Sequence, residues 1–281
     1  MKKTIIAMMA LTAVASAATV DTISKTDQDL LSYLDFTPNA DGGFQSAAGS
    51  VGYGNQAYLK DGYGLIAGAP DTAAHTMWSK DSYRSSVSTN NFTLSFDVRS
   101  FGTGDLLSVG AGWSGSNWDK VTLHTGADGK LGLKFYDPDN GGAAVTVSTG
   151  LTSGTRTEWT TITLVGDSVK LEGDDTASNL VYLYVNGVSK GYLNMSDLDT
   201  PNQGDLGAWL TSGVDGYQFG GAFRGAGTTT TISGLTEIDN VLFYKRALDA
   251  NEVKALIVPE PTTATLSLLA LAGLAARRRR K

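Results

Sequence analysis

Short runs of alternating apolar and polar residues fill most of the chain between Asp29 and Tyr244. The segment 92–99, Phe-Thr-Leu-Ser-Phe-Asp-Val-Arg, places every second side chain on an apolar face, and 131–136 has the same period. A period of two is typical of antiparallel strands that are buried on one face. Gly, Asn, Asp and Ser separate these runs, and helical periodicity is nearly absent. The pattern therefore predicts an all-β domain.

The strongest turn signal is Asn186-Gly187, which follows the strand-like run Val181–Val185. A type I′ turn needs positive φ at both central residues, and Asn-Gly is a preferred pair for it. We therefore expect a hairpin in which a second strand, about Val188–Leu193, returns beside the first. Many such reversals account for the 34 glycines, and no phosphate-binding or dinucleotide-binding motif is present.

The closing strand is expected at Glu237–Tyr244, with a short helix after it. Asp249 and Glu252 form a capping-box pair for this helix, and Leu248 can contact Val253 at its start. The sequence Ile-Asp-x-Val-x-Phe-Tyr-x-Arg-Ala-Leu, preceded by a Leu-Tyr-Val-Asn-Gly hairpin, resembles the laminin G-like (concanavalin A-like) superfamily. The resemblance implies an antiparallel two-sheet jelly-roll sandwich with one concave sheet. Only the hairpin sequence and the closing-strand sequence are specific to this superfamily.

The first residues have the order of a secretory signal peptide. Lys2 and Lys3 precede an apolar run, Ile5–Val14, and small residues follow at 15–18. This run is too short to span the roughly 30 Å of a bilayer core as a helix. We therefore expect residues 1–18 to be a signal peptide that is cleaved near Ala17 or Ala18.

The C-terminus combines Pro259-Glu260-Pro261, an apolar stretch at 262–276 and a basic tip at 277–281. This order resembles the PEP-CTERM sorting signal of Gram-negative bacteria. The resemblance implies recognition of 258–281 by a membrane sorting enzyme, removal of the tail and delivery to the cell surface, outer membrane or extracellular matrix. A plain tail anchor is the alternative. In both cases the membrane is contacted only through the tail, and 19–257 is the laminin G-like body.

The body is strongly acidic and contains no cysteine. Without the two end segments, 15 basic and 27 acidic residues are left. An excess of negative charge argues against nucleic acid as a partner, because phosphates would be repelled. The absence of cysteine excludes thiol chemistry and disulfides, and two histidines are too few for most zinc sites.

Aromatic rings near polar groups are the best candidates for ligand contact. Trp113, Asn117 and Trp118 lie in one Gly-rich segment, while Trp209 and Tyr217 belong to a second cluster. An exposed ring can stack on the apolar face of a sugar, and an amide can bind its hydroxyl groups. Each ring taken singly is more often core or rim packing. Together these five residues form the predicted carbohydrate site.

Asp239 is the candidate metal ligand. In jelly rolls of this superfamily the Asp of the closing strand helps to hold a structural Ca²⁺, together with backbone carbonyls of the N-terminal segment, here around Asp35–Gly42. Calcium prefers such oxygen ligands. A surface Asp at a strand end is the alternative. The acidic segment Asp137–Gly141 is better explained as an Asx-type turn than as a second calcium loop.

The superfamily also contains glycoside hydrolases with the strand motif Glu-x-Asp-x-x-Glu, whose carboxylates act as nucleophile and acid/base. Glu237 and Asp239 match its first half, but Leu242 stands where the acid/base Glu belongs. We therefore expect a non-catalytic surface module that binds carbohydrate or a protein partner. A glycoside hydrolase acting on a surface or host glycan is the alternative.

Overall fold

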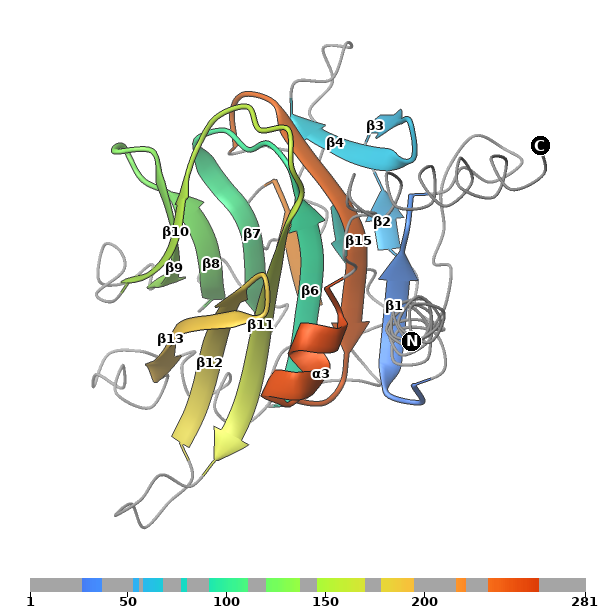
Figure 1. Cartoon of the computed structure of the whole chain (residues 1–281), viewed down its shortest axis with the longest axis vertical. Helices are drawn as coiled ribbons and strands as arrows, with labels where there is room; N and C mark the ends of the chain where they lie inside the picture. Colours follow the sequence, from blue (N-terminus) through green and yellow to red (C-terminus); the bar gives the residue numbers. More distant parts are fainter. Residues whose placement is uncertain are drawn as a thin grey trace, which may run out of the picture.

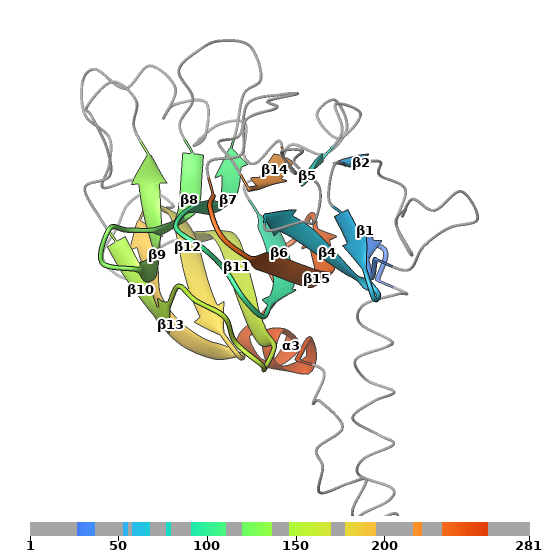
Figure 2. The ribbon, with the colours of Figure 1, turned by 90° about the horizontal axis from the view of Figure 1, so that it is seen from above.

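Over the residues that the structure describes, the protein is a two-layer antiparallel β-sandwich with one short helix on its outside (Figures 1 and 2). A computed structural model describes residues 27–36, 53–55, 58–67, 77–79, 91–110, 120–136, 146–169, 178–194, 216–220 and 232–257. The predicted all-β jelly-roll class and the short helix after the last strand are confirmed.

Within the described ranges, one sheet has eight strands and the other has seven. The eight-stranded sheet consists of β1 (Leu30–Leu34), β3 (Tyr58–Lys60), β4 (Tyr63–Ala67), β6 (Phe92–Val98), β11 (Thr160–Val169), β12 (Ser178–Val185), β13 (Val188–Asn194) and β15 (Thr236–Tyr244). The seven-stranded sheet consists of β2 (Tyr53–Asn55), β5 (Met77–Ser79), β7 (Gly104–Gly110), β8 (Lys120–Thr125), β9 (Lys130–Tyr136), β10 (Thr146–Thr152) and β14 (Gly216–Phe219).

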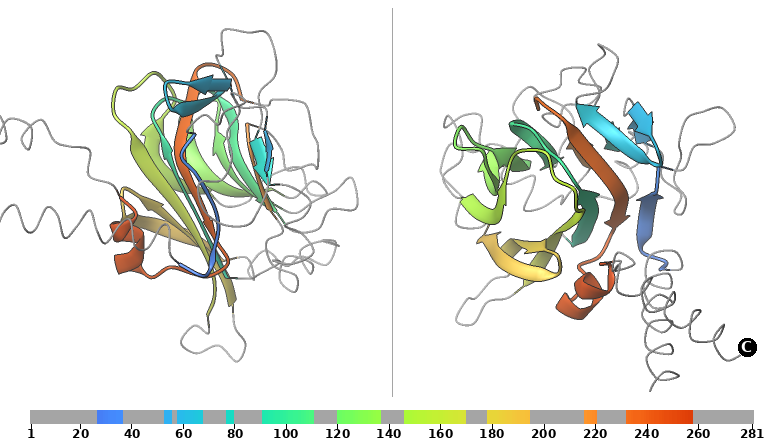
Figure 3. Two further views of the ribbon diagram at one scale, coloured as in Figure 1. Left: turned by 90° about the vertical axis from the view of Figure 1, so that its right-hand side faces the viewer. Right: turned by 45° about the horizontal axis from the view of Figure 1, so that its top comes forward.

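Strand order follows the path β13-β12-β11-β6-β15-β4-β3 in the larger sheet and β10-β9-β8-β7-β14-β5-β2 in the smaller one. The closing strand β15 has β6 along one side. Its other side is shared, because β4 pairs with the first part of β15 and β1 pairs with the last part. The closing strand is therefore central, and the two views of Figure 3 show it between β6 and the β1/β4 side.

The core lies between the sheets and is built from the inward-facing residues of both. Alternation puts Phe92, Leu94 and Phe96 of β6 into this core, where the Phe96 ring meets Phe219 of the opposite sheet at 4.9 Å between centroids. An edge-to-face contact of this kind is favourable beyond the area that it buries. The alternation at 92–99 therefore predicted correctly which side chains of β6 face the core.

The Asn186-Gly187 hairpin is confirmed. Strands β12 and β13 pair up to Val185 and Val188, and the two residues between them have φ values of 47° and 68°. These positive values are those of a type I′ turn, which only Asn, Asp and Gly adopt readily.

Helix α3 (Ala250–Ala255) covers part of the outer face of the eight-stranded sheet (Figure 1). Its predicted capping box is present: the Asp249 carboxylate accepts from the backbone N–H of Glu252 at 2.9 Å, and the Glu252 carboxylate accepts from the N–H of Asp249 at 2.9 Å. Leu248 and Val253 are buried in one cluster with Tyr244 of β15. The helix is thus fixed by its cap and by a second, smaller apolar core.

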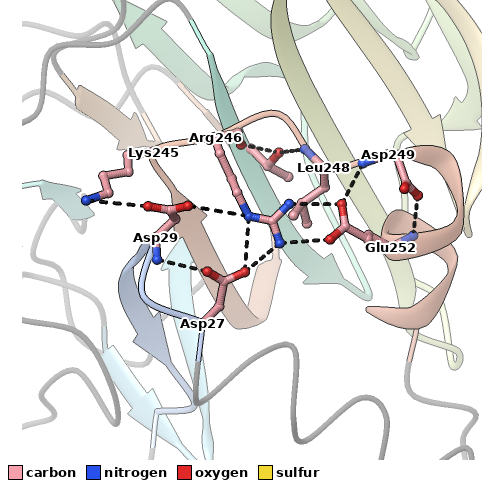
Figure 4. Close-up of polar contacts among 8 residues, drawn as sticks. Asp27, Asp29, Lys245, Arg246, Leu248, Asp249 and Glu252 are labelled. Atoms are coloured by element: carbon pink, nitrogen blue, oxygen red, sulfur yellow. Dashed lines mark hydrogen bonds and ion pairs between the residues drawn. The ribbon is translucent and has the colours of Figure 1, made fainter.

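Arg246 connects this helix to the first described residues, as Figure 4 shows. Its guanidinium donates to both carboxylate oxygens of Glu252, at 2.9 and 2.8 Å, and also to Asp27. Burial alone would raise the pKa of Asp27, but hydrogen bonds from Arg246 and the Asp29 backbone hold it below its ordinary value. The segment before β1 and helix α3 are therefore held at one corner of the sandwich.

The predicted signal peptide, 1–18, and the sorting tail, 258–281, lie outside the described residues. No helix among the residues that the structure describes is long and apolar enough to cross a membrane.

Candidate ligand-binding end and carboxylate cluster

One end of the seven-stranded sheet gathers the segments that carry the predicted ligand residues. Gly216 of β14 pairs with Gly110 of β7, Gly110 pairs with Lys120 of β8, and Lys120 pairs with Tyr136 of β9. These four residues form one row across the sheet, at the strand ends seen side by side in Figure 2. The connections that continue from these residues are therefore attached to the sheet at one end.

Three such connections are relevant. The segment 111–119, which contains Trp113, Asn117 and Trp118, joins β7 to β8, and Trp209 precedes β14. The segment 137–145 joins β9 to β10 and includes the predicted Asx turn. The three ring residues and the amide lie outside the described residues, as do Asp137–Gly141. The structure nevertheless brings the attachment points of all these segments to one end of one sheet.

Tyr217, the fifth predicted ligand residue, is a core side chain. Its exposed fraction is 0%, and its ring lies 5.8 Å from Phe219 and 5.4 Å from Phe243 between centroids. Burial raises the pKa of Tyr217 to about 12, while the Ser32 hydroxyl acts in the opposite direction. The expectation of ligand contact is corrected here, because alternation along β14 directs Tyr217 inward and Gln218 outward.

The outer face of the same sheet carries a polar row directly next to this end. Gln218, Ser108 and Thr122 are register partners on β14, β7 and β8, and each is at most 2% exposed. The Thr122 Oγ1 atom has no hydrogen-bond partner within the described ranges. At this degree of burial the three side chains are not accessible to a ligand from solvent.

Asp239, the predicted metal ligand, lies at a β-bulge in the closing strand. It is the register partner of Asp97 on β6, and the register then shifts before Leu242 pairs with Ser95. Asn240 has a φ of 47°, a left-handed conformation that Asn tolerates better than most residues. Ile238 and Val241 face the core. The bulge therefore turns two successive side chains, Asp239 and Asn240, to the outer face.

A chain of hydrogen bonds links this bulge to its neighbours. The Tyr33 hydroxyl donates to Asn240 Oδ1 at 3.1 Å, and Asn240 Nδ2 donates to Asp97 Oδ2 at 2.9 Å. The other oxygen of Asp97 accepts from the Thr161 hydroxyl at 2.6 Å. The network spans four adjacent strands, β1, β15, β6 and β11, and fixes the Asp97 carboxylate opposite Asp239.

Burial raises the pKa of Asp239 to about 7, and the negative charges of Asp97 and Asp35 add to this increase. The N–H of Asn240, which donates to Asp239 Oδ1 at 2.8 Å, and the charge of Arg99 act against it. A bound cation would remove the repulsion between these carboxylates. Within the described ranges, no three His, Cys, Asp or Glu side chains form a metal-binding group.

Glu237, the candidate nucleophile of the hydrolase alternative, is held by Arg99. The guanidinium donates to both of its oxygens at 2.8 Å and lies 4.7 Å from the centroids of the Tyr63 and Trp159 rings. The hydrogen bond and charge of Arg99 lower the pKa of Glu237 against the effect of burial. Leu242 is buried under helix α3. A bidentate partner makes Glu237 a weak nucleophile.

Comparison of the sequence with models of protein families and with curated proteins finds no match. Solved structures are similar in fold. A sialidase of Trypanosoma rangeli in complex with sialic acid aligns with a TM-score of 0.52 and 16% identity, over 89% of this chain and 38% of the sialidase. The receptor-binding domain of botulinum neurotoxin type G aligns with a TM-score of 0.47 and 14% identity, over 81% of this chain and 50% of that domain.

A SAP-like pentraxin from Limulus polyphemus aligns with a TM-score of 0.42 and 14% identity, over 68% of this chain and 78% of the pentraxin. The chain thus spans half or less of the sialidase and neurotoxin chains. At these identities the similarity concerns the fold alone.

Proposed function

We propose that the protein is a non-catalytic carbohydrate-binding protein, with its glycan site at the end of the seven-stranded sheet marked by Gly216, Gly110, Lys120 and Tyr136. The observation that carries the proposal is the register of these four residues, because it brings the attachment points of the segments with Trp113, Trp118 and Trp209 to one end of the sheet. Loops on a rigid sandwich are a common place for recognition.

The place of action is proposed from the two ends of the sequence. Export through residues 1–18 and sorting through 258–281 would deliver the body to the cell surface, outer membrane or extracellular matrix of a Gram-negative bacterium. The partners are then a glycan and the C-terminal sorting enzyme. A surface protein as the ligand is the alternative partner.

A glycan array probed with the full chain, with calcium and with a chelator, tests the proposal. Trp113→Ala, Trp118→Ala and Trp209→Ala are each expected to weaken binding to the glycans that the wild type retains, by roughly 5- to 10-fold. Tyr58→Ala, on β3 of the other sheet, serves as a matched aromatic control and should bind normally. If the wild type binds no glycan, or if all four variants bind alike, the glycan site is rejected.

One observation favours the hydrolase alternative. Glu237 and Asp239 are two positions apart on the closing strand, and their pKa values are shifted in opposite directions, lowered for Glu237 and raised to about 7 for Asp239. Opposite shifts are typical of a carboxylate nucleophile and its acid. Release of reducing sugar from a β-glucan or mucin-type glycan, lost in Glu237→Gln, would support it. If no substrate of a broad glycan panel is turned over, the hydrolase alternative is rejected and binding remains the proposed function.

We also propose a structural Ca²⁺ at Asp239. Asp97 faces Asp239, Asp35 lies close enough to repel it, and backbone carbonyls in this region can add oxygen ligands. The cation would stabilise a strand end without taking part in sugar recognition.

A further inference from the structure

Three tyrosines form an outward-facing aromatic surface at the far edge of the eight-stranded sheet. Tyr182 and Tyr184 of β12 and Tyr192 of β13 define this surface, called here the tyrosine face. Tyr182 is the register partner of Tyr192, and their rings lie 5.4 Å apart between centroids at an interplanar angle of 56°. Val181 and Leu183 fill the core on the other side of the strand. The tyrosine face is therefore on the opposite sheet from the predicted loop-end site.

The rings are held in place on one side and open on the other. Tyr182 and Tyr184 pack against the cluster under helix α3, which includes Val165 and Val253. Tyr192 is 47% exposed, which makes it the most exposed aromatic side chain among the described residues. A ring that is both braced by a neighbour and exposed presents a fixed apolar surface to solvent, and little side-chain entropy is lost when a ligand covers it.

Charged groups of both signs border this surface. Asp167 lies on β11 two residues along from Val165, the register partner of Tyr182, and its charge adds to burial in raising the pKa values of Tyr182 and Tyr184. Asp249 has the same effect on Tyr184. Two exposed lysines lie on the neighbouring elements, Lys190 two residues before Tyr192 on β13 and Lys254 directly after Val253 on α3. Two negative and two positive groups favour neither a strongly anionic nor a strongly cationic ligand.

We propose that the tyrosine face is a second carbohydrate contact, which takes a neutral hexopyranose residue with its apolar ring face on Tyr192. A sugar ring combines an apolar face with hydroxyl groups that both donate and accept hydrogen bonds. The ring of Tyr192 supplies the first surface, while Asp167 and the tyrosine hydroxyls supply acceptors and donors at its border. Because the two sugar contacts lie on different sheets, one molecule can hold two glycan chains at once.

Affinity electrophoresis of the full chain in gels that contain laminarin, arabinogalactan or mannan tests this proposal. The Tyr192→Ala variant is expected to lose roughly 3- to 10-fold in affinity for the polysaccharide that retards the wild type, whereas Tyr192→Phe should retain it. Val188→Ala, on the same strand and 59% exposed, is the control. Circular dichroism and the melting temperature establish that each variant is folded.

The result is separable from the test of the loop-end site. If the Trp113 and Trp118 variants bind normally and Tyr192→Ala does not, the tyrosine face stands and the loop-end proposal fails. If Tyr192→Ala is folded and migrates like the wild type in all three gels, the tyrosine face is not a sugar contact. If none of the three gels retards the wild type, the tyrosine-face proposal is also overturned.

Discussion

Arg246 bonds to Asp27 across 219 positions of sequence, at the corner where the first described residues meet helix α3. The same guanidinium also holds Glu252, the residue that completes the helix cap. Arg246→Ala should therefore lower the free energy of unfolding by about 2 kcal/mol, because two partly buried carboxylates lose their shared cation. Urea denaturation followed by fluorescence would measure the change.

The neighbouring cation provides the control for this prediction. Lys245 approaches Asp29 at 3.4 Å, with 44% of its side chain exposed. An exposed pair of this kind contributes little, so Lys245→Ala should change the free energy of unfolding by less than about 0.5 kcal/mol. If both substitutions change the free energy of unfolding equally, the Arg246 contacts stabilise the fold no more than the exposed pair does.

Stability should depend on pH through Asp239. The pKa of Asp239 in the folded protein is about 7, above the roughly 3.9 of an unfolded chain. Between these values the folded state keeps a proton that the unfolded state has lost, so the free energy of unfolding falls as pH rises from about 4 to 7. Asp239→Asn should flatten this slope and be more stable than the wild type at pH 8, by about 2 kcal/mol, in metal-free buffer.

Thermal melting at pH 4 and pH 8 with a chelator gives the comparison. The two proteins should melt at similar temperatures at pH 4, where Asp239 is protonated in the folded state and roughly half protonated in the unfolded state, so that little of the repulsion is left. A wild type that melts higher than Asp239→Asn at pH 8 without metal would contradict the repulsion between Asp239, Asp97 and Asp35.

Calcium should make the wild type more stable than Asp239→Asn at pH 8. A cation bound to the ionised carboxylate stabilises only the folded state, by about 2.7 kcal/mol at a concentration of 100 times Kd. The wild type should therefore gain melting temperature with calcium at pH 8, and Asp239→Asn should gain none. Magnesium should have a smaller effect, because it demands a stricter geometry. An equal gain in both proteins would place the calcium elsewhere, and no gain in either would remove the site.

Gly187 should be less replaceable than Gly150, although both have left-handed backbones, with φ of 68° and 79°. A Cβ at Gly187 would lie 2.6 Å from Cδ1 of Ile257 and 3.1 Å from Cγ of Lys254, whereas a Cβ at Gly150 meets nothing within 4 Å. Gly150→Ala should cost about 1 kcal/mol for its backbone, and Gly187→Ala about 2 to 3 kcal/mol. Chemical denaturation of both variants checks whether the helix packs on the hairpin turn.

Local pattern was enough to predict the fold and several elements. The alternation at 92–99, the Asn186-Gly187 turn and the Asp249/Glu252 capping box each depend on residues close in sequence, and all three are confirmed. Such features act through the geometry of a few successive residues, so the sequence carries them directly.

The side on which a candidate residue lies was harder to predict. Strand β14 is only four residues long, too short to indicate which face is buried, and Tyr217 proved to be inward-facing. The bulge at Asn240 is equally invisible in the sequence, yet it decides that Asp239 faces outward beside Asn240. The contact between Arg246 and Asp27 joins residues too distant in sequence for any local pattern to connect them.

Arg246 holds the first and the last described segments of the sandwich next to each other. Asp27 and Glu252 touch the same guanidinium, so the chain enters and leaves the fold at one point (Figure 4). Domains with adjacent ends commonly tolerate circular permutation. A short linker from Ile257 to Asp27 would join these ends, and the chain could then be opened at the exposed Asp61-Gly62 turn between β3 and β4 without separating the two sheets.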